Sequence, residues 1–74
     1  MSDKKETIYI KDEYIKLGQA LKLAGAVDSG VDAKNVINEG LVKVNGIICT
    51  QRGKKLVIGD TVLFDEKEYI IGGI

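Results

Sequence analysis

The segment Ser29–Gly46, with the sequence SGVDAKNVINEGLVKVNG, joins a helical pattern to a hairpin pattern through a single glycine. Ser29 is a favourable N-cap residue, and Gly40 ends the helix that follows it. The apolar stripe of this helix consists of Ala33, Val36 and Ile37. Asn45-Gly46 favours a type I′ turn between two short apolar strands. Because so short a helix cannot bury its stripe alone, the hairpin must fold back beneath it.

The remaining sequence predicts one more helix and several strands. Leu17, Ala20, Leu21 and Ala24 recur with the spacing of one helix face, and Gly25 ends this first helix. Strands are predicted at residues 6–10, 41–44, 47–50, 56–58, 61–64 and 69–71, with a basic loop at 51–55 and a charged turn at 65–68. The pattern therefore predicts an α+β fold, with two short consecutive helices packed on a small, mainly antiparallel sheet of about five strands.

Length and composition exclude several classes of function. A chain of 74 residues is expected to form a single domain over 1–74, and we expect it to be a monomer. It has one cysteine and no histidine, so neither an internal disulfide nor a zinc or haem site is expected, and no cofactor is implied. No carboxylate is paired with a nucleophile, so we expect no enzyme. No apolar run suits a signal peptide or a membrane span, which predicts a cytoplasmic location.

The charge of the chain is segregated although the net charge is zero. Residues 16–59 contain seven basic and three acidic residues, a net charge of +4, while both flanking segments are acidic. A local positive field attracts phosphates, so the middle of the chain is the candidate nucleic-acid surface. Any single lysine there is more commonly only a solvated side chain.

Candidate phosphate contacts come from both helices, the hairpin and the basic loop. Ser29 and Gly30 lie at a helix N-terminus, where unpaired N–H groups favour anions. The sequence predicts a mobile basic loop beside a basic helix face, which suits the backbone of a folded RNA. The candidate residues are Lys16, Lys22, Ser29, Gly30, Lys34, Asn38, Lys43, Arg52, Lys54 and Lys55. Tyr9, Tyr14, Phe64 and Tyr69 lie outside the basic middle, so base stacking is not expected to dominate.

Residues 15–64 resemble the RNA-binding domain of the ribosomal protein S-four type. The matching residues are Lys16, Leu17, Leu21, Ser29, Ala33, Ile37, Gly40, Val42, Val44, Asn45, Gly46, Gly59, Asp60 and Val62. The stretches LGQALK, SGVDAK and RGKKL are similar to the small stand-alone, YaaA-like branch, and Gly30 stands where most members have an arginine. The resemblance implies an alpha-L-type fold and non-catalytic binding of structured RNA, such as ribosomal RNA, its precursor or transfer RNA, by shape and phosphate contacts.

Two alternatives remain open on the sequence alone. The stretches VKVNG and LVIGDTVLF and the pair Gly72-Gly73 are also similar to ubiquitin-like sulfur carriers, although Ile74 follows the glycines. A protein-interaction module on the same fold is the other alternative, because a fold does not determine a function.

Overall fold

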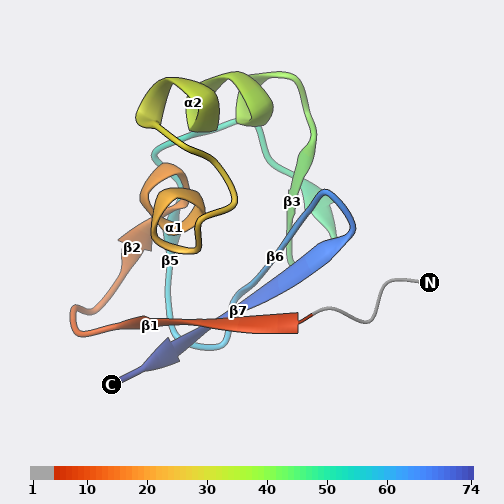
Figure 1. The fold of residues 1–74 in the computed structure, drawn as a ribbon. Coiled ribbons are helices and arrows are strands. Elements are labelled where there is room, and N and C mark those ends of the chain that lie inside the picture. The colour runs from red at the N-terminus through yellow and green to blue at the C-terminus, as the bar shows by residue number, and fades with distance from the viewer. Residues whose placement is uncertain (1–4) are drawn as a thin grey trace.

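Two short helices pack against a five-stranded sheet and a separate two-stranded sheet in the computed structural model, which describes residues 5–74 (Figure 1). The helices are α1 (Leu17–Leu23) and α2 (Gly30–Asn38). The strands are β1 (Lys5–Ile10), β2 (Ile15–Lys16), β3 (Val42–Val44), β4 (Ile47–Ile48), β5 (Lys55–Leu56), β6 (Thr61–Phe64) and β7 (Lys67–Gly73). The predicted α+β fold is confirmed.

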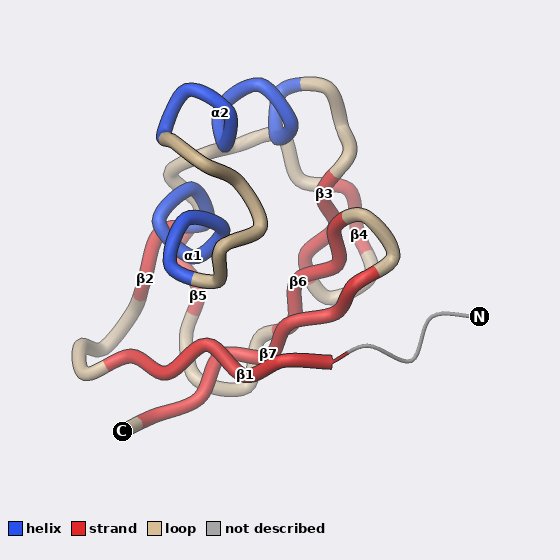
Figure 2. The backbone as a smooth tube through the Cα atoms, viewed as in Figure 1, coloured by secondary structure: helices blue, strands red, loops and turns tan. Residues whose placement is uncertain are grey.

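The larger sheet has the strand order β1-β7-β6-β3-β4 (Figure 2). Only the pairing of β1 with β7 is parallel, and the other pairings in this sheet are antiparallel. The prediction of a mainly antiparallel sheet of about five strands is therefore confirmed. The parallel pair brings the first and last strands of the described chain side by side, with Ile8 opposite Ile71.

Two tight turns define the hairpins of this sheet. Asn45 and Gly46 have φ values of 52° and 85°, as the predicted type I′ turn between β3 and β4 requires. Asp65 and Glu66 also have positive φ, at 56° and 63°. Phe64 pairs with Lys67, so the turn between β6 and β7 contains two residues. The predicted charged turn over 65–68 was therefore too long, because Lys67 and Glu68 belong to β7.

The two-stranded sheet was not predicted. β2 pairs antiparallel with β5, with Ile15 opposite Leu56 and Lys16 opposite Lys55. The sequence predicted a strand at 56–58, whereas β5 spans Lys55–Leu56 and lies outside the larger sheet. Two residues carry no periodic pattern, so only the folded chain reveals that the segment before α1 meets the end of the basic loop.

The core lies between the helices and the larger sheet. Both predicted apolar stripes contribute to it, since Leu17, Ala20, Leu21, Ala33 and Ile37 are completely buried. Beneath them lie Val42, Val62 and Ile71 of the sheet, together with Leu56 of β5. The predicted N-cap is confirmed, because the backbone N–H of Asp32 donates a 3.2 Å hydrogen bond to Ser29 Oγ. The first turn of α2 is thereby fixed.

Ion pairs occur at the β1–β7 edge of the sheet. Lys67 Nζ lies 3.0 Å from Glu6 Oε2, and Lys5 Nζ lies 3.7 Å from Glu68 Oε1. The hydrogen bond that Lys67 donates to the Glu6 carboxylate raises the pKa of Lys67, and burial raises the pKa of the neighbouring Tyr69. The lysines of this edge therefore have acidic partners. No helix within residues 5–74 has the length and apolar character needed to cross a bilayer.

Candidate nucleic-acid interface

Three separate segments of the chain meet at a cavity of about 330 Å³. The end of β2 and the first turns of α1 form one side, the start of α2 forms another, and the loop before β5 forms the third. The lining residues are Lys16, Gly18, Gln19, Lys22, Gly30, Ala33, Arg52 and Gly53. We call this cavity the basic groove. It unites four of the predicted phosphate contacts, namely Lys16, Lys22, Gly30 and Arg52.

The basic loop, residues 51–55, is held in place by the start of α1. The backbone N–H of Leu17 donates to the carbonyl oxygen of Lys54 at 2.8 Å, and that of Gly18 donates to the carbonyl oxygen of Arg52 at 3.1 Å. The first N–H groups of a helix have no partner inside the helix, so the loop satisfies two of them. The loop that was predicted to be mobile is thus anchored to α1 at two backbone positions. The backbone that carries Arg52 is fixed against α1.

Arg52 packs directly over a glycine of α1. A Cβ atom at Gly18 would lie 2.7 Å from Cγ of Arg52, closer than two carbon atoms can approach without displacement. Gly30, on the other side of the basic groove, has open space where a side chain would begin. The absence of a side chain at Gly18 therefore allows Arg52, the only arginine of the sequence, to lie in the groove.

The cations at the basic groove have no ion-pair partner among residues 5–74. Within residues 5–74, the ion pairs involve only Lys5 and Lys67, both at the β1–β7 edge. Lys16, Lys22 and Arg52 are exposed and form none with a described carboxylate. A concave site lined by unpaired positive charges attracts anions. Within the same residues, no group of three or more His, Cys, Asp or Glu side chains is placed to hold a metal ion.

The other predicted contacts extend from the basic groove or lie outside it. Lys34 and Asn38 follow Gly30 at intervals of four along α2, so they continue the same side of the helix. Ser29 caps this helix at its beginning. Lys54 lines a neighbouring cavity of about 390 Å³ beside the β3–β4 hairpin.

Lys43 does not lie on this surface. It alternates in β3 with the buried Val42 and Val44, which face the helices, so its side chain lies on the opposite face of the sheet. There its cross-strand neighbours are the exposed Ile48 and Leu63. The prediction that Lys43 extends the patch was wrong in placement, because the helices cover only the other face of β3.

A model of the S4 domain family matches residues 8–72. This chain belongs to the S4 domain family. The resemblance to the RNA-binding domain of the ribosomal protein S-four type is thereby confirmed, and the matched region is wider than residues 15–64. In this S4 domain the basic groove is built from the two helices and the loop before β5.

Relatives and a solved structure agree with this assignment. The protein named "Putative RNA-binding protein YbcJ" of Escherichia coli (strain K12) is 44% identical over 54 residues, covering 73% of this chain and 77% of that protein. "Probable ribosome maturation protein RlbA" of Bacillus subtilis (strain 168) is 47% identical over 55 residues, covering 74% and 78%. The solution structure of YbcJ, described as having an alpha-L motif involved in RNA binding, has a TM-score of 0.69 and 37% identity, covering 89% of this chain and 85% of that one.

The two glycines near the end of this S4 domain do not form a free tail. Gly72 and Gly73 lie in β7, where they pair with Tyr9 and Ile10 of β1. The N–H of Ile74 donates to the carbonyl oxygen of Ile10 at 3.1 Å. A sulfur carrier needs a terminal diglycine that reaches into another protein. Neither this geometry nor the family supports that alternative.

One aromatic residue beside the basic loop was missed. Lys55 Nζ lies 4.8 Å from the centre of the Tyr14 ring, a cation–π contact. Tyr14 precedes β2, and the pairing of β2 with β5 brings it to the basic loop. The contact of Tyr14 with Lys55 was not predicted, because the two residues are far apart in sequence and Tyr14 lies just outside the basic middle of the chain. An aromatic residue is therefore available beside the cations.

Gly18→Ala is expected to move Arg52 without unfolding the domain. The added methyl group would collide with Cγ of Arg52, while alanine is favoured over glycine within a helix by about 1 kcal/mol. The Nε–Hε resonance of the single arginine should therefore shift in NMR spectra. Gly30→Ala is the matched control, since nothing lies within 4 Å of its added Cβ. An unchanged arginine resonance in Gly18→Ala would contradict the packing described here.

Proposed function

We propose that this S4 domain is a small, non-catalytic protein that binds structured RNA through the basic groove. The observation that carries the proposal is the meeting of Lys16 and Lys22 of the β2–α1 segment with Arg52 of the basic loop in one concave site, where no carboxylate of residues 5–74 pairs with them. Folded RNA presents closely spaced phosphates, and cations held in fixed positions recognise that spacing. Ribosomal RNA, its precursor and transfer RNA are the candidate targets.

The names of the relatives support RNA as the partner. YbcJ is named as a "Putative RNA-binding protein", and RlbA is named as a "Probable ribosome maturation protein". Both are more than 40% identical to this chain over about three quarters of its length. A ribosomal RNA or its precursor is therefore the first target to test. Crosslinking in cells, followed by sequencing of the attached RNA, identifies it.

The mode of binding we propose is contact with phosphates and RNA shape. Lys34 and Asn38 extend the basic groove along α2, and Lys54 and Lys55 extend it along the basic loop. Ser29 and Gly30 add the N-terminal turn of α2, whose N–H groups favour anions. All these contacts position an RNA backbone, and none requires a particular base sequence. We therefore expect several folded RNAs to bind, with discrimination by shape.

Binding of structured RNA is expected to depend strongly on salt. If about four to six phosphates are neutralised, the plot of log affinity against log salt concentration should have a slope of roughly 3 to 5 in magnitude. Between about 50 and 200 mM salt the affinity should then fall by roughly 60- to 1000-fold. Fluorescence anisotropy with a labelled ribosomal RNA fragment and with transfer RNA measures it. Absence of binding at low salt, or binding unaffected by salt, would refute the proposed function.

A further inference from the structure

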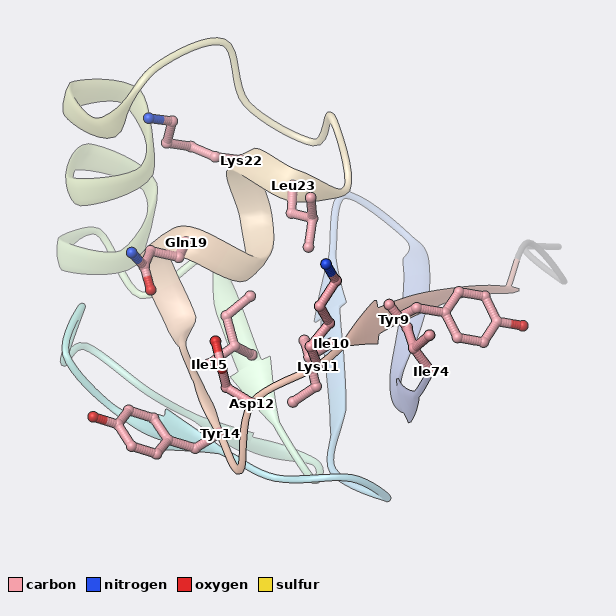
Figure 3. Close-up of a pocket in the computed structure, with 10 residues that line it drawn as sticks. All are labelled: Tyr9, Ile10, Lys11, Asp12, Tyr14, Ile15, Gln19, Lys22, Leu23 and Ile74. Atoms are coloured by element: carbon pink, nitrogen blue, oxygen red, sulfur yellow. The ribbon is translucent and has the colours of Figure 1, made fainter.

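A second cavity, of about 560 Å³, lies beside the basic groove (Figure 3). The segment from β1 to β2, helix α1 and Ile74 line this open cavity. Ile10, Ile15 and Leu23 gather around its centre, and Tyr9 and Tyr14 lie at opposite sides. We call it the α1 pocket. Its volume is within the range of about 300 to 1,000 Å³ that is typical of sites for small ligands.

The α1 pocket and the basic groove share two residues. Gln19 and Lys22 line both cavities, and both side chains extend from α1 toward α2. These residues are three apart on the helix, so they form a common border about 5 Å long. A molecule lying in the basic groove therefore passes directly along the edge of the α1 pocket.

The lining of the α1 pocket is amphipathic. Leu23 is 61% exposed and Tyr14 is 40% exposed, so apolar surface remains accessible there. Asp12 and Gln19 supply hydrogen-bonding groups, and Lys11 adds a positive charge to that of Lys22. A nucleobase has the matching chemistry, with two apolar faces and a polar edge. Unpaired bases in RNA are recognised by such combinations of stacking and edge hydrogen bonds.

We propose that the α1 pocket receives one unpaired base of the RNA whose phosphates lie in the basic groove. The proposal rests on the proposed function and adds a second recognition element to it. Ile15 and Leu23, which flank the centre of the pocket, contact the faces of the base, and Asp12 accepts a hydrogen bond from an exocyclic amino group. Lys22, at the common border, binds the phosphate next to that base. A base carrying an amino group, such as adenine, cytosine or guanine, is therefore preferred over uracil.

The pocket's surroundings favour RNA over a protein segment as the occupant. Two lysines and one carboxylate surround the apolar centre, and the border leads into the basic groove, whose cations pair with no carboxylate that the structure describes. A groove for an apolar peptide is expected to have depleted charge at its centre and no such continuation. Because the α1 pocket continues into the basic groove, its occupant is expected to carry phosphates, as RNA does.

The test compares two RNAs that differ by one feature. Both contain the same stem, and one also carries a short unpaired extension with an adenine. Wild-type protein is expected to bind the extended RNA about tenfold more tightly than the blunt stem, because one stacked base is added. Leu23→Ala should remove most of this difference and leave the affinity for the blunt stem unchanged. Replacement of the adenine by uracil should lower the affinity for the extended RNA toward that for the blunt stem.

Val31→Ala is the matched control for Leu23→Ala. Val31 is 67% exposed on α2 and does not line the α1 pocket, so its loss should change neither affinity. Leu23 is itself 61% exposed, so its truncation should leave the fold intact. Equal binding of both RNAs by the wild type would overturn the pocket assignment alone. So would a Leu23→Ala variant that binds both RNAs like the wild type, which is the result expected if a protein segment occupies the α1 pocket. Failure to bind either RNA would overturn the proposed function and the pocket assignment with it.

Discussion

Replacing Arg52 and Lys54 together with alanine is expected to weaken RNA binding roughly 100-fold. Each charged hydrogen bond to a phosphate contributes about 1.5 kcal/mol or more, which corresponds to at least tenfold in affinity. The slope of log affinity against log salt should decrease in magnitude by about 1.4 to 1.8 at the same time. Both side chains are exposed, so the fold should be retained. Anisotropy titrations at several salt concentrations give both quantities.

The matched control is the double variant Lys5→Ala and Lys43→Ala. It removes the same charge from the opposite face of the sheet, where Lys43 lies opposite Leu63 and Lys5 lies opposite Glu68. The loss of the exposed Lys5–Glu68 ion pair should cost at most about 1 kcal/mol of stability. We expect RNA binding to change less than about threefold. Equal losses in the two double variants would mean that total charge, and not the basic groove, determines binding.

Leu56→Ala is expected to lower the free energy of unfolding by about 2 to 5 kcal/mol. Leu56 is completely buried, and its truncation removes apolar contacts and leaves a cavity. At about 0.05 to 0.15 kcal/mol per residue, a domain of this size has only about 4 to 11 kcal/mol of stability in total, so the loss is a large fraction. Denaturation with urea, followed by circular dichroism, measures it.

The neighbouring residue provides the control for that experiment. Val57 follows Leu56 directly but is 48% exposed, so Val57→Ala should cost well under half as much. Because Leu56 ends the basic loop and pairs with Ile15, its truncation should also loosen the β2–β5 pair. Hydrogen exchange at the N–H groups of Leu17 and Gly18 should then accelerate. Similar destabilisation by both variants would contradict the burial of Leu56 as the anchor of this loop.

The parts of the fold that were predicted correctly depend on local signals. Ser29 at the N-cap, the two apolar stripes and the Asn45-Gly46 turn are each encoded within a few neighbouring residues. The β2–β5 pair was missed because it joins segments forty residues apart through two residues each. No sequence pattern within either segment predicts such a contact.

The candidate site shows the same division between local and distant information. The excess of lysines in the middle of the chain was evident, and Lys16, Lys22, Gly30 and Arg52 do meet in one groove. Lys43 was included in the patch, although its alternation with Val42 and Val44 assigns it to the far face of the strand. The approach of Arg52 to Gly18 and of Lys55 to Tyr14 could be found only in the folded chain.

The hydrogen bonds between α1 and the basic loop determine when conformational entropy is lost. A loose loop would be ordered only on contact with RNA, and its loss of freedom would then subtract from the binding free energy. Here the N–H groups of Leu17 and Gly18 already hold the carbonyl groups of Lys54 and Arg52 in the free protein. That entropy is lost during folding, together with the formation of the core. The free and RNA-bound domains should therefore have nearly the same backbone, and a chain with no net charge can still present a ready-made cationic surface.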